Sequence, residues 1–172
     1  MKHFILIAML LTAGCSSSAV IEEKTTPIYH VYLDDSYSQD HKRMIEDAMS
    51  EWSLATNQKV QFNFEYAVLS DETVNLNQFA VIYIYNDFTP ASGELGWTIW
   101  DNGINTAEIV IPDNIANTYF HTVALHELGH SLHLGHETDS NITSVMHPDV
   151  NDCNTSLTTD DVEKFNTIWN VK

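Results

Sequence analysis

A short histidine-rich segment carries the residues best suited to chemistry. His126 and His130 are four residues apart, so on a helix both imidazoles project from one face and can bind a single metal ion. Glu127 follows the first histidine, where its carboxylate can take a proton from a metal-bound water. This H-E-x-x-H pattern predicts zinc-assisted hydrolysis, with His126 and His130 as ligands and Glu127 as the catalytic residue.

A catalytic zinc ion needs a third protein ligand and keeps one position open for water. His136, six residues after His130, is the first candidate, and His133 is the alternative. If the chain leaves the helix after His130, for which Gly135 could supply a late break, His136 can return to the metal. If the helix continues, His133 faces the metal side instead.

Together these residues resemble the metzincin clan of zinc metalloproteases, whose pattern is H-E-x-x-H-x-x-G-x-x-H followed by a Met-turn. Residues 122–132 and the Ser-Val-Met-His-Pro sequence at 144–148 are most similar to the matrixin (matrix metalloprotease-like) family. The chain departs from that family in having His133 in place of glycine and Glu137 where matrixins usually have serine. The resemblance implies one catalytic zinc ion and a peptide or protein substrate.

The same resemblance implies which residues surround the zinc site. Met146 would form an apolar floor beneath it, and residues 147–150 would form part of the pocket for the substrate residue after the cut bond. Residues 95–100 would be an edge strand over the cleft, to which an extended peptide can add as a further strand. The residues predicted to line the cleft are Leu95, Gly96, Trp97, Thr98, His147 and Pro148.

Hydrophobic periodicity predicts the elements that must position these residues. Apolar residues at helical spacing indicate helices at 39–56 and 117–134, the second capped by Asn117 or Thr118. Thr158, followed three residues later by Asp161, indicates a capped final helix. Strands are expected at 28–33, 60–67 (half-buried), 79–85 (central and buried on both faces) and 107–111.

The predicted fold is α/β and metzincin-like. A twisted mixed sheet of about five strands packs against the first helix and the catalytic helix. A small C-terminal subdomain, with the Met-turn and the final helix, follows His136, and the cleft is expected between the two parts. The catalytic domain spans 27–172, a length that suits one core.

The first residues have the pattern of an export signal. A short basic start precedes an apolar run at 4–11, which is too short to span a bilayer permanently. Leu-Thr-Ala-Gly-Cys at 11–15 resembles a bacterial lipobox. It implies a signal peptide at 1–14, lipidation of Cys15, a tether through residue 26 and a lipoprotein on the outer membrane or cell surface. The alternative is an ordinary signal peptide cut near Ala19, which gives a secreted protein.

The composition limits the classes of molecule that the protein can be expected to bind. The chain has 172 residues, 7 Lys and Arg against 24 Asp and Glu, and a net charge of −17. Such a surface repels nucleic acid and anionic lipid, and we expect a monomer. No complete calcium-loop pattern is present in the sequence, so calcium is not predicted. If Cys15 is lipidated, the second cysteine, Cys153, is left as a quiet thiol.

These patterns predict a zinc-dependent endopeptidase that hydrolyses extracytoplasmic proteins by Glu-assisted attack of zinc-bound water. One alternative is a catalytically inert zinc module with a peptide-binding or structural role. The reason to consider it is His133, which stands where the family has glycine. Another is a zinc hydrolase acting on cell-wall peptide cross-links. The intact Glu127 favours an enzyme, because a structural zinc site does not need it.

Overall fold

The computed structural model describes residues 28–67, 80–86, 94–101, 106–149 and 154–171. The expected signal peptide, Cys15, the tether and Cys153 lie outside these residues. Within them the elements are β1 (Ile28–Asp34), α1 (Gln39–Ala55), β2 (Gln61–Ala67), β3 (Ala80–Tyr85), β4 (Trp97–Asp101), β5 (Thr106–Val110), α2 (Asn117–Ser131) and α3 (Thr159–Trp169).

The strands form one mixed sheet in the order β2-β1-β3-β5-β4. β1, β2, β3 and β5 run parallel, and β4 pairs antiparallel with β5 at the edge, with Thr98 opposite Ile109. β3 is the central strand, and its sequence AVIYIY is buried over its first five residues, as strands covered on both faces require. The prediction of a mixed sheet of about five strands is confirmed.

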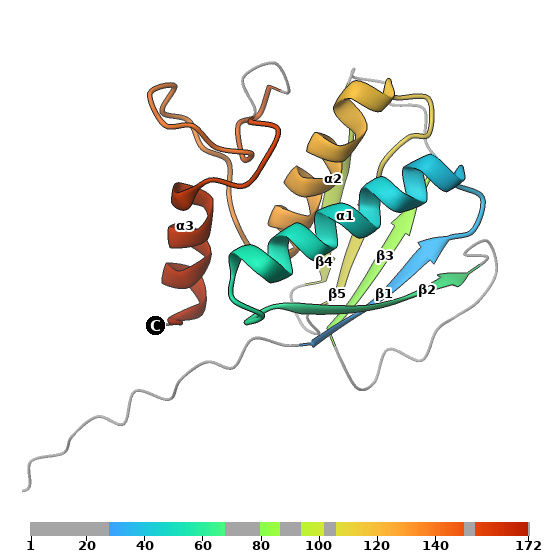
Figure 1. The fold of residues 1–172 in the computed structure, drawn as a ribbon, viewed down its shortest axis with the longest axis horizontal. Helices are drawn as coiled ribbons and strands as arrows, with labels where there is room; N and C mark the ends of the chain where they lie inside the picture. Colours follow the sequence, from blue (N-terminus) through green and yellow to red (C-terminus); the bar gives the residue numbers. More distant parts are fainter. Residues whose placement is uncertain (1–27, 68–79, 87–93, 102–105, 150–153, 172) are drawn as a thin grey trace, which may run out of the picture.

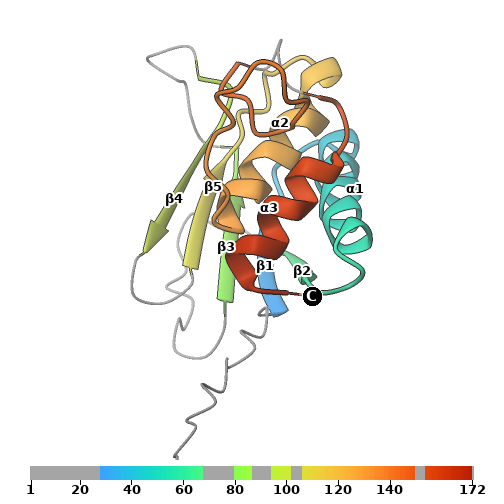
Figure 2. The ribbon, with the colours of Figure 1, turned by 90° about the vertical axis from the view of Figure 1, so that its left-hand side faces the viewer.

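Helices α1 and α2 lie side by side against one face of the sheet (Figures 1 and 2). Trp52 of α1 is fully buried between the two helices, and its indole nitrogen donates to the carbonyl oxygen of Leu125 in α2 at 3.0 Å. A buried indole N–H needs such a partner. Trp52 therefore helps to fix the position of α2 at Leu125, the residue before His126.

Helix α3 lies on the same side of the sheet as α1 and α2 (Figure 2). Its buried residues Phe165 and Trp169 pack on the core, and the indole nitrogen of Trp169 donates to the carbonyl oxygen of Leu132 at 3.0 Å. At its start, Thr158 and Asp161 form the predicted capping box. The last helix is thereby held against the end of α2.

Two local predictions are wrong. The N-cap of α2 is Ala116, not Asn117 or Thr118. The side-chain oxygen of Asn117 is engaged elsewhere, 3.0 Å from Nε2 of His41. Strand β2 is mostly exposed rather than half-buried, because it is an outer strand that α1 covers only in part.

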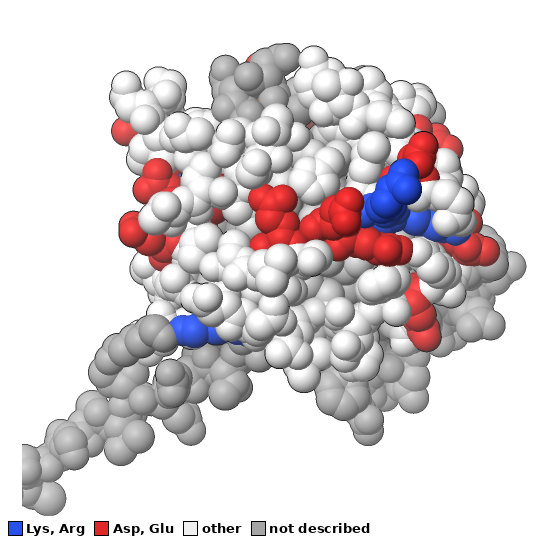
Figure 3. Space-filling model, in the orientation of Figure 1, with Lys and Arg blue, Asp and Glu red and all other residues white. Residues whose placement is uncertain are grey.

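Acidic side chains gather in a band over α1 on the face shown in Figure 3. The helix contributes Asp40, Glu46, Asp47 and Glu51 to this surface. None of the helices in the described parts of the chain is long and apolar enough to cross a membrane.

Candidate metal centre

The end of α2 determines where the histidines lie. Leu132 caps the helix, and His133 follows with a φ of 70°, in the left-handed region. The amide of His133 donates to the carbonyl of His130 at 2.8 Å, and the amide of Leu134 donates to that of Gly129 at 3.0 Å. These bonds form a Schellman motif, in which the left-handed residue is usually glycine. The chain therefore turns back here, and the prediction of a helix that continues to residue 134 is wrong.

Three histidine side chains meet after this turn: His126 and His130 from α2, and His136 from the segment that follows. One ring nitrogen of each lies within 4.8 Å of the other two, and the Nε2 atoms of His130 and His136 are 3.2 Å apart. Two nitrogens bound to a tetrahedral zinc ion are about 3.3 Å apart, so the cluster fits a single zinc ion. His133, the alternative ligand, instead lies edge-on to Trp100, with ring centroids 4.3 Å apart.

Backbone carbonyls orient two of the three rings. Nδ1 of His126 donates to the carbonyl oxygen of Val145 at 2.8 Å, and Nδ1 of His130 donates to that of Leu134 at 2.8 Å. Because a carbonyl can only accept, each ring carries its proton on Nδ1 and keeps the Nε2 lone pair for a metal. These partners are backbone atoms, so no side-chain pattern in the sequence signals them.

The surroundings keep these imidazoles neutral. Burial lowers the pKa of His126 from 6.5 to about 4, while the hydrogen bond to the Val145 carbonyl raises it and the charges of His130 and His136 lower it. Burial also lowers the pKa of His130. Neutral imidazole is the form that binds metal ions, so both rings are ready for a ligand role at neutral pH.

Glu127 is buried beside these histidines, with 4% of its surface exposed. Burial raises the pKa of its carboxyl from 4.5 to about 7, the hydrogen bond from Thr98 lowers it, and the charge of Glu94 raises it. Oγ1 of Thr98 lies 2.7 Å from Oε2 of Glu127 and 3.0 Å from its backbone oxygen. A carboxyl group with a pKa near neutrality can accept a proton and return it.

The residues predicted to line the cleft fall in two places. Four are half-buried at β4 and just before it: Leu95, Gly96, Trp97 and Thr98. In the predicted Met-turn, residues 144–148, Met146 is fully buried and Pro148 is exposed. Nε2 of the buried His147 is 2.7 Å from the carbonyl oxygen of Ile142. Their contact with a substrate, and the place of Met146 beneath zinc, stay predictions.

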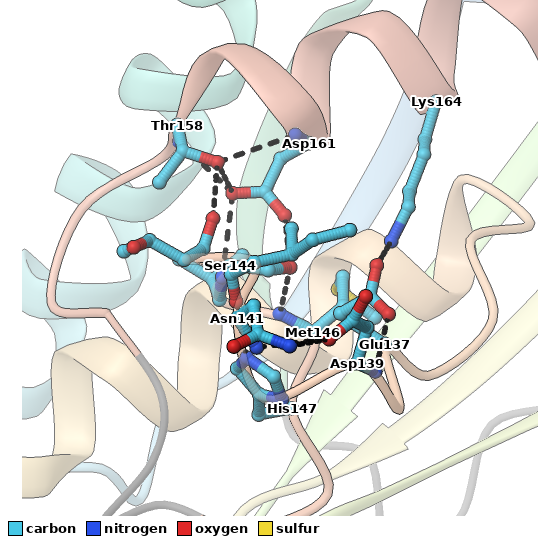
Figure 4. Close-up of polar contacts among 12 residues, drawn as sticks. Glu137, Asp139, Asn141, Ser144, Met146, His147, Thr158, Asp161 and Lys164 are labelled. Carbon is cyan, nitrogen blue, oxygen red and sulfur yellow. Dashed lines mark hydrogen bonds and ion pairs between the residues drawn. The ribbon is translucent and has the colours of Figure 1, made fainter.

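Polar contacts tie the segment after His136 to α3 (Figure 4). The carboxylate of Glu137 pairs with Lys164 of α3 and accepts the amide of Asp139 at 2.7 Å. The amide of Glu137 donates to the carbonyl of Met146 at 2.8 Å. Glu137, the residue after His136, is therefore held in place by contacts with α3 and with Met146.

Asp161 provides a second anchor from α3 (Figure 4). It is fully buried and accepts hydrogen bonds from the hydroxyl of Ser144 at 2.5 Å and the amide of Val145 at 3.3 Å, besides capping with Thr158. The sequence indicates Asp161 only as a capping residue; nothing in the spacing signals its contact with Ser144. Because the Val145 carbonyl orients His126, Asp161 supports the first histidine indirectly.

Comparison with known proteins agrees with this geometry. The family model of the matrixins matches residues 23–170. The high choriolytic enzyme 1, a hatching-enzyme zinc protease of the medaka fish Oryzias latipes, has a TM-score of 0.56 and 15% identity, covering 84% of this chain and 90% of its own. Archaemetzincin from Methanopyrus kandleri has a TM-score of 0.56 and 16% identity, covering 82% of this chain and 94% of its own. At these identities the two structures show likeness of fold. Curated protein sequences gave no match.

Since the family model spans most of the 172 residues, the chain belongs to the matrixin family. It has the metzincin fold and is a zinc metalloendopeptidase. The three-histidine cluster fits its single catalytic zinc ion.

Proposed function

We propose that this zinc endopeptidase cleaves proteins outside the cytoplasm, with His126, His130 and His136 holding the metal and Glu127 acting as general base. The observation that carries the proposal is the meeting of three imidazole nitrogens within 4.8 Å of one another, next in sequence to a buried glutamate. His133 adopts the left-handed conformation that the turn to His136 needs, so its presence in place of glycine does not disrupt the cluster.

When bound, zinc polarises the carbonyl group of the scissile peptide bond and makes water more acidic. The water oxygen forms a bond to the carbonyl carbon, and Glu127 takes the proton that the water loses. The C–N bond then breaks, and Glu127 delivers that proton to the leaving amine. The Nδ1–H bonds of His126 and His130 to backbone carbonyls hold both rings in the tautomer that presents Nε2.

Strand β4 supports binding of an extended peptide. It is an edge strand of the sheet, antiparallel to β5, and α2 packs beside it. An unpaired strand edge offers backbone donors and acceptors to an added strand. A peptide bound along β4 would lie near Glu127, because Thr98 of this strand contacts that residue.

The proposal of an extracytoplasmic substrate rests on the N-terminal sequence alone. The lipobox-like 11–15 segment supports a lipid on Cys15. Metabolic labelling with a radioactive fatty acid should mark the protein and should fail for Cys15→Ser. Labelling of both proteins, or of neither, would count against the anchor.

Cleavage of a peptide library by the zinc-loaded protein, followed by mass spectrometry, tests the activity. Glu127→Gln should retain one zinc ion per chain and lose most of the turnover, because only the proton transfer is removed. The matched control Glu163→Gln, an exposed residue of α3, should cleave like the parent. Full activity in Glu127→Gln would refute the mechanism.

The same assay separates the remaining functions. Zinc binding without cleavage of any library peptide, and with binding of some of them, would indicate an inert peptide-binding module. Release of fragments only from purified cell wall would indicate a hydrolase of peptide cross-links.

A further inference from the structure

Strand β4 presents alternate residues to the catalytic helix. Because side chains along a strand point to opposite faces, Thr98 and Trp100 share one face of β4, and Ile99 points the other way. The hydroxyl of Thr98 reaches Glu127, and the ring of Trp100 meets His133 just beyond α2. Ile99 is 57% exposed. The face of β4 turned towards α2 is therefore built against the catalytic segment.

The Thr98 hydroxyl contacts Glu127 at two points. Oγ1 lies 2.7 Å from the carboxylate oxygen Oε2 and 3.0 Å from the backbone carbonyl oxygen of the same residue. The single hydroxyl hydrogen is within reach of both acceptors, and the shorter distance is to the carboxylate. A bond from a hydroxyl to an ionised carboxylate is among the stronger hydrogen bonds, so this contact restricts the rotamers open to Glu127.

Gly96 leaves the room that this arrangement needs. A Cβ atom at residue 96 would lie 2.9 Å from Oε1 of Glu127 and 2.9 Å from Cγ1 of Val123. Both distances are too short for atoms that are not bonded. Any side chain here would push the carboxylate or the strand away, so glycine permits the close approach of β4 to α2.

We propose that β4 positions the general base. Thr98 holds Oε2 of Glu127 and thereby turns Oε1, which occupies the space that Gly96 leaves open, to the proton of the attacking water. This role rests on the proposed function, in which Glu127 is the base. Thr98 is a positioning residue, since it touches neither metal nor substrate in this role. Its loss should lower kcat, while substrate binding along β4 should be little affected.

The test compares Thr98→Val, which keeps the shape and lacks the hydroxyl, with Thr98→Ser, which keeps the hydroxyl. Each full-length protein is assayed for zinc content, melting temperature, kcat and KM. The valine variant should retain zinc and lose about tenfold to a hundredfold in kcat, the effect of one hydrogen bond to a charged group. Its KM should change by less than about twofold. The serine variant should recover most of the kcat, and the exposed Thr118→Val should behave like the parent.

Three results would overturn the proposal: unchanged kcat and KM in Thr98→Val, an equal loss of kcat in Thr98→Ser, or a raised KM with unchanged kcat in Thr98→Val. The last would mean that Thr98 contacts the substrate instead. If Thr98→Val does not fold, the smaller Thr98→Ala removes the same hydroxyl. Glu127→Gln distinguishes failure of the proposed mechanism from failure of the positioning role of Thr98. Full activity in Glu127→Gln would refute both. An inactive Glu127→Gln beside a fully active Thr98→Val would remove only this role.

Discussion

Gly129 lies in α2 between His126 and His130, and its replacement by alanine tests how closely Met146 packs against this helix. A Cβ atom there would lie 2.4 Å from Sδ of Met146 and 3.2 Å from Cζ2 of Trp52. Both neighbours are fully buried, so neither can move into solvent. Overpacking of this kind costs about 1–3 kcal/mol, and alanine gains about 1 kcal/mol over glycine in a helix. The difference is about 0–2 kcal/mol, so we expect Gly129→Ala to destabilise the fold by up to about 2 kcal/mol.

A double-mutant cycle with Met146→Ala identifies the obstacle. Met146→Ala alone should cost about 2–5 kcal/mol through the cavity that it leaves. In that background Gly129→Ala should be neutral or stabilising by up to about 1 kcal/mol, because only the contact with Trp52 remains. Urea unfolding in the presence of a chelator measures each free energy of unfolding without a contribution from metal binding. An equal loss from Gly129→Ala in both backgrounds would refute the close approach of Met146.

Three further predictions concern the segment after α2. The hydrogen bond from Lys164, together with those from the backbone amides of Asp139 and Thr138, lowers the pKa of Glu137 from 4.5 to about 2. These contacts therefore stabilise the fold above the unfolded pKa and cease to do so as the pH falls towards 2. The difference in melting temperature between the parent and Lys164→Met, measured with a chelator, should therefore shrink on acidification; a constant difference would contradict an ionic pair. His133→Gly should have a free energy of unfolding in urea about 1 kcal/mol higher than His133→Ala, since the left-handed conformation favours glycine. Equal stability of the two variants would contradict that conformation. His136→Ala should lose zinc on dialysis and His133→Ala should retain it, and the reverse result would make His133 the third ligand.

The parts of the fold that depend on local pattern were predictable. The β-rich run at 79–85 predicts a central strand, and β3 is central. The pairing of Thr158 with Asp161 predicts a capping box, and the helix begins there. The N-cap of α2 was not predictable, because Asn117 meets His41, a residue 76 positions away. Local patterns carry no information about such a distant partner.

In the candidate metal centre too, features set by local sequence were predictable, and contacts between residues distant in sequence were not. The spacing of His126 and His130 is a helical spacing, so it indicates that the two rings share a face before the fold is known. The contact between Thr98 and Glu127 joins residues 29 positions apart, and it requires β4 to lie against α2. Glu137 and Lys164 are 27 positions apart, and their pairing likewise needs α3 to be placed first.

The sequence leaves the third ligand open between His133 and His136, because the backbone conformation of residue 133 determines which of the two rings can approach His126 and His130. His133 takes the left-handed conformation, which costs a residue other than glycine about 1–2 kcal/mol. Its ring lies 4.3 Å from that of Trp100 and 5.6 Å from that of Trp169. Aromatic contacts are worth about 0.5–1.5 kcal/mol each, so two of them are of the size needed to offset the strain. Since Trp100 belongs to β4 and Trp169 to α3, the residue that replaces glycine also connects the edge strand to the C-terminal helix. Glycine at this position would make the turn with less strain and would lose that connection.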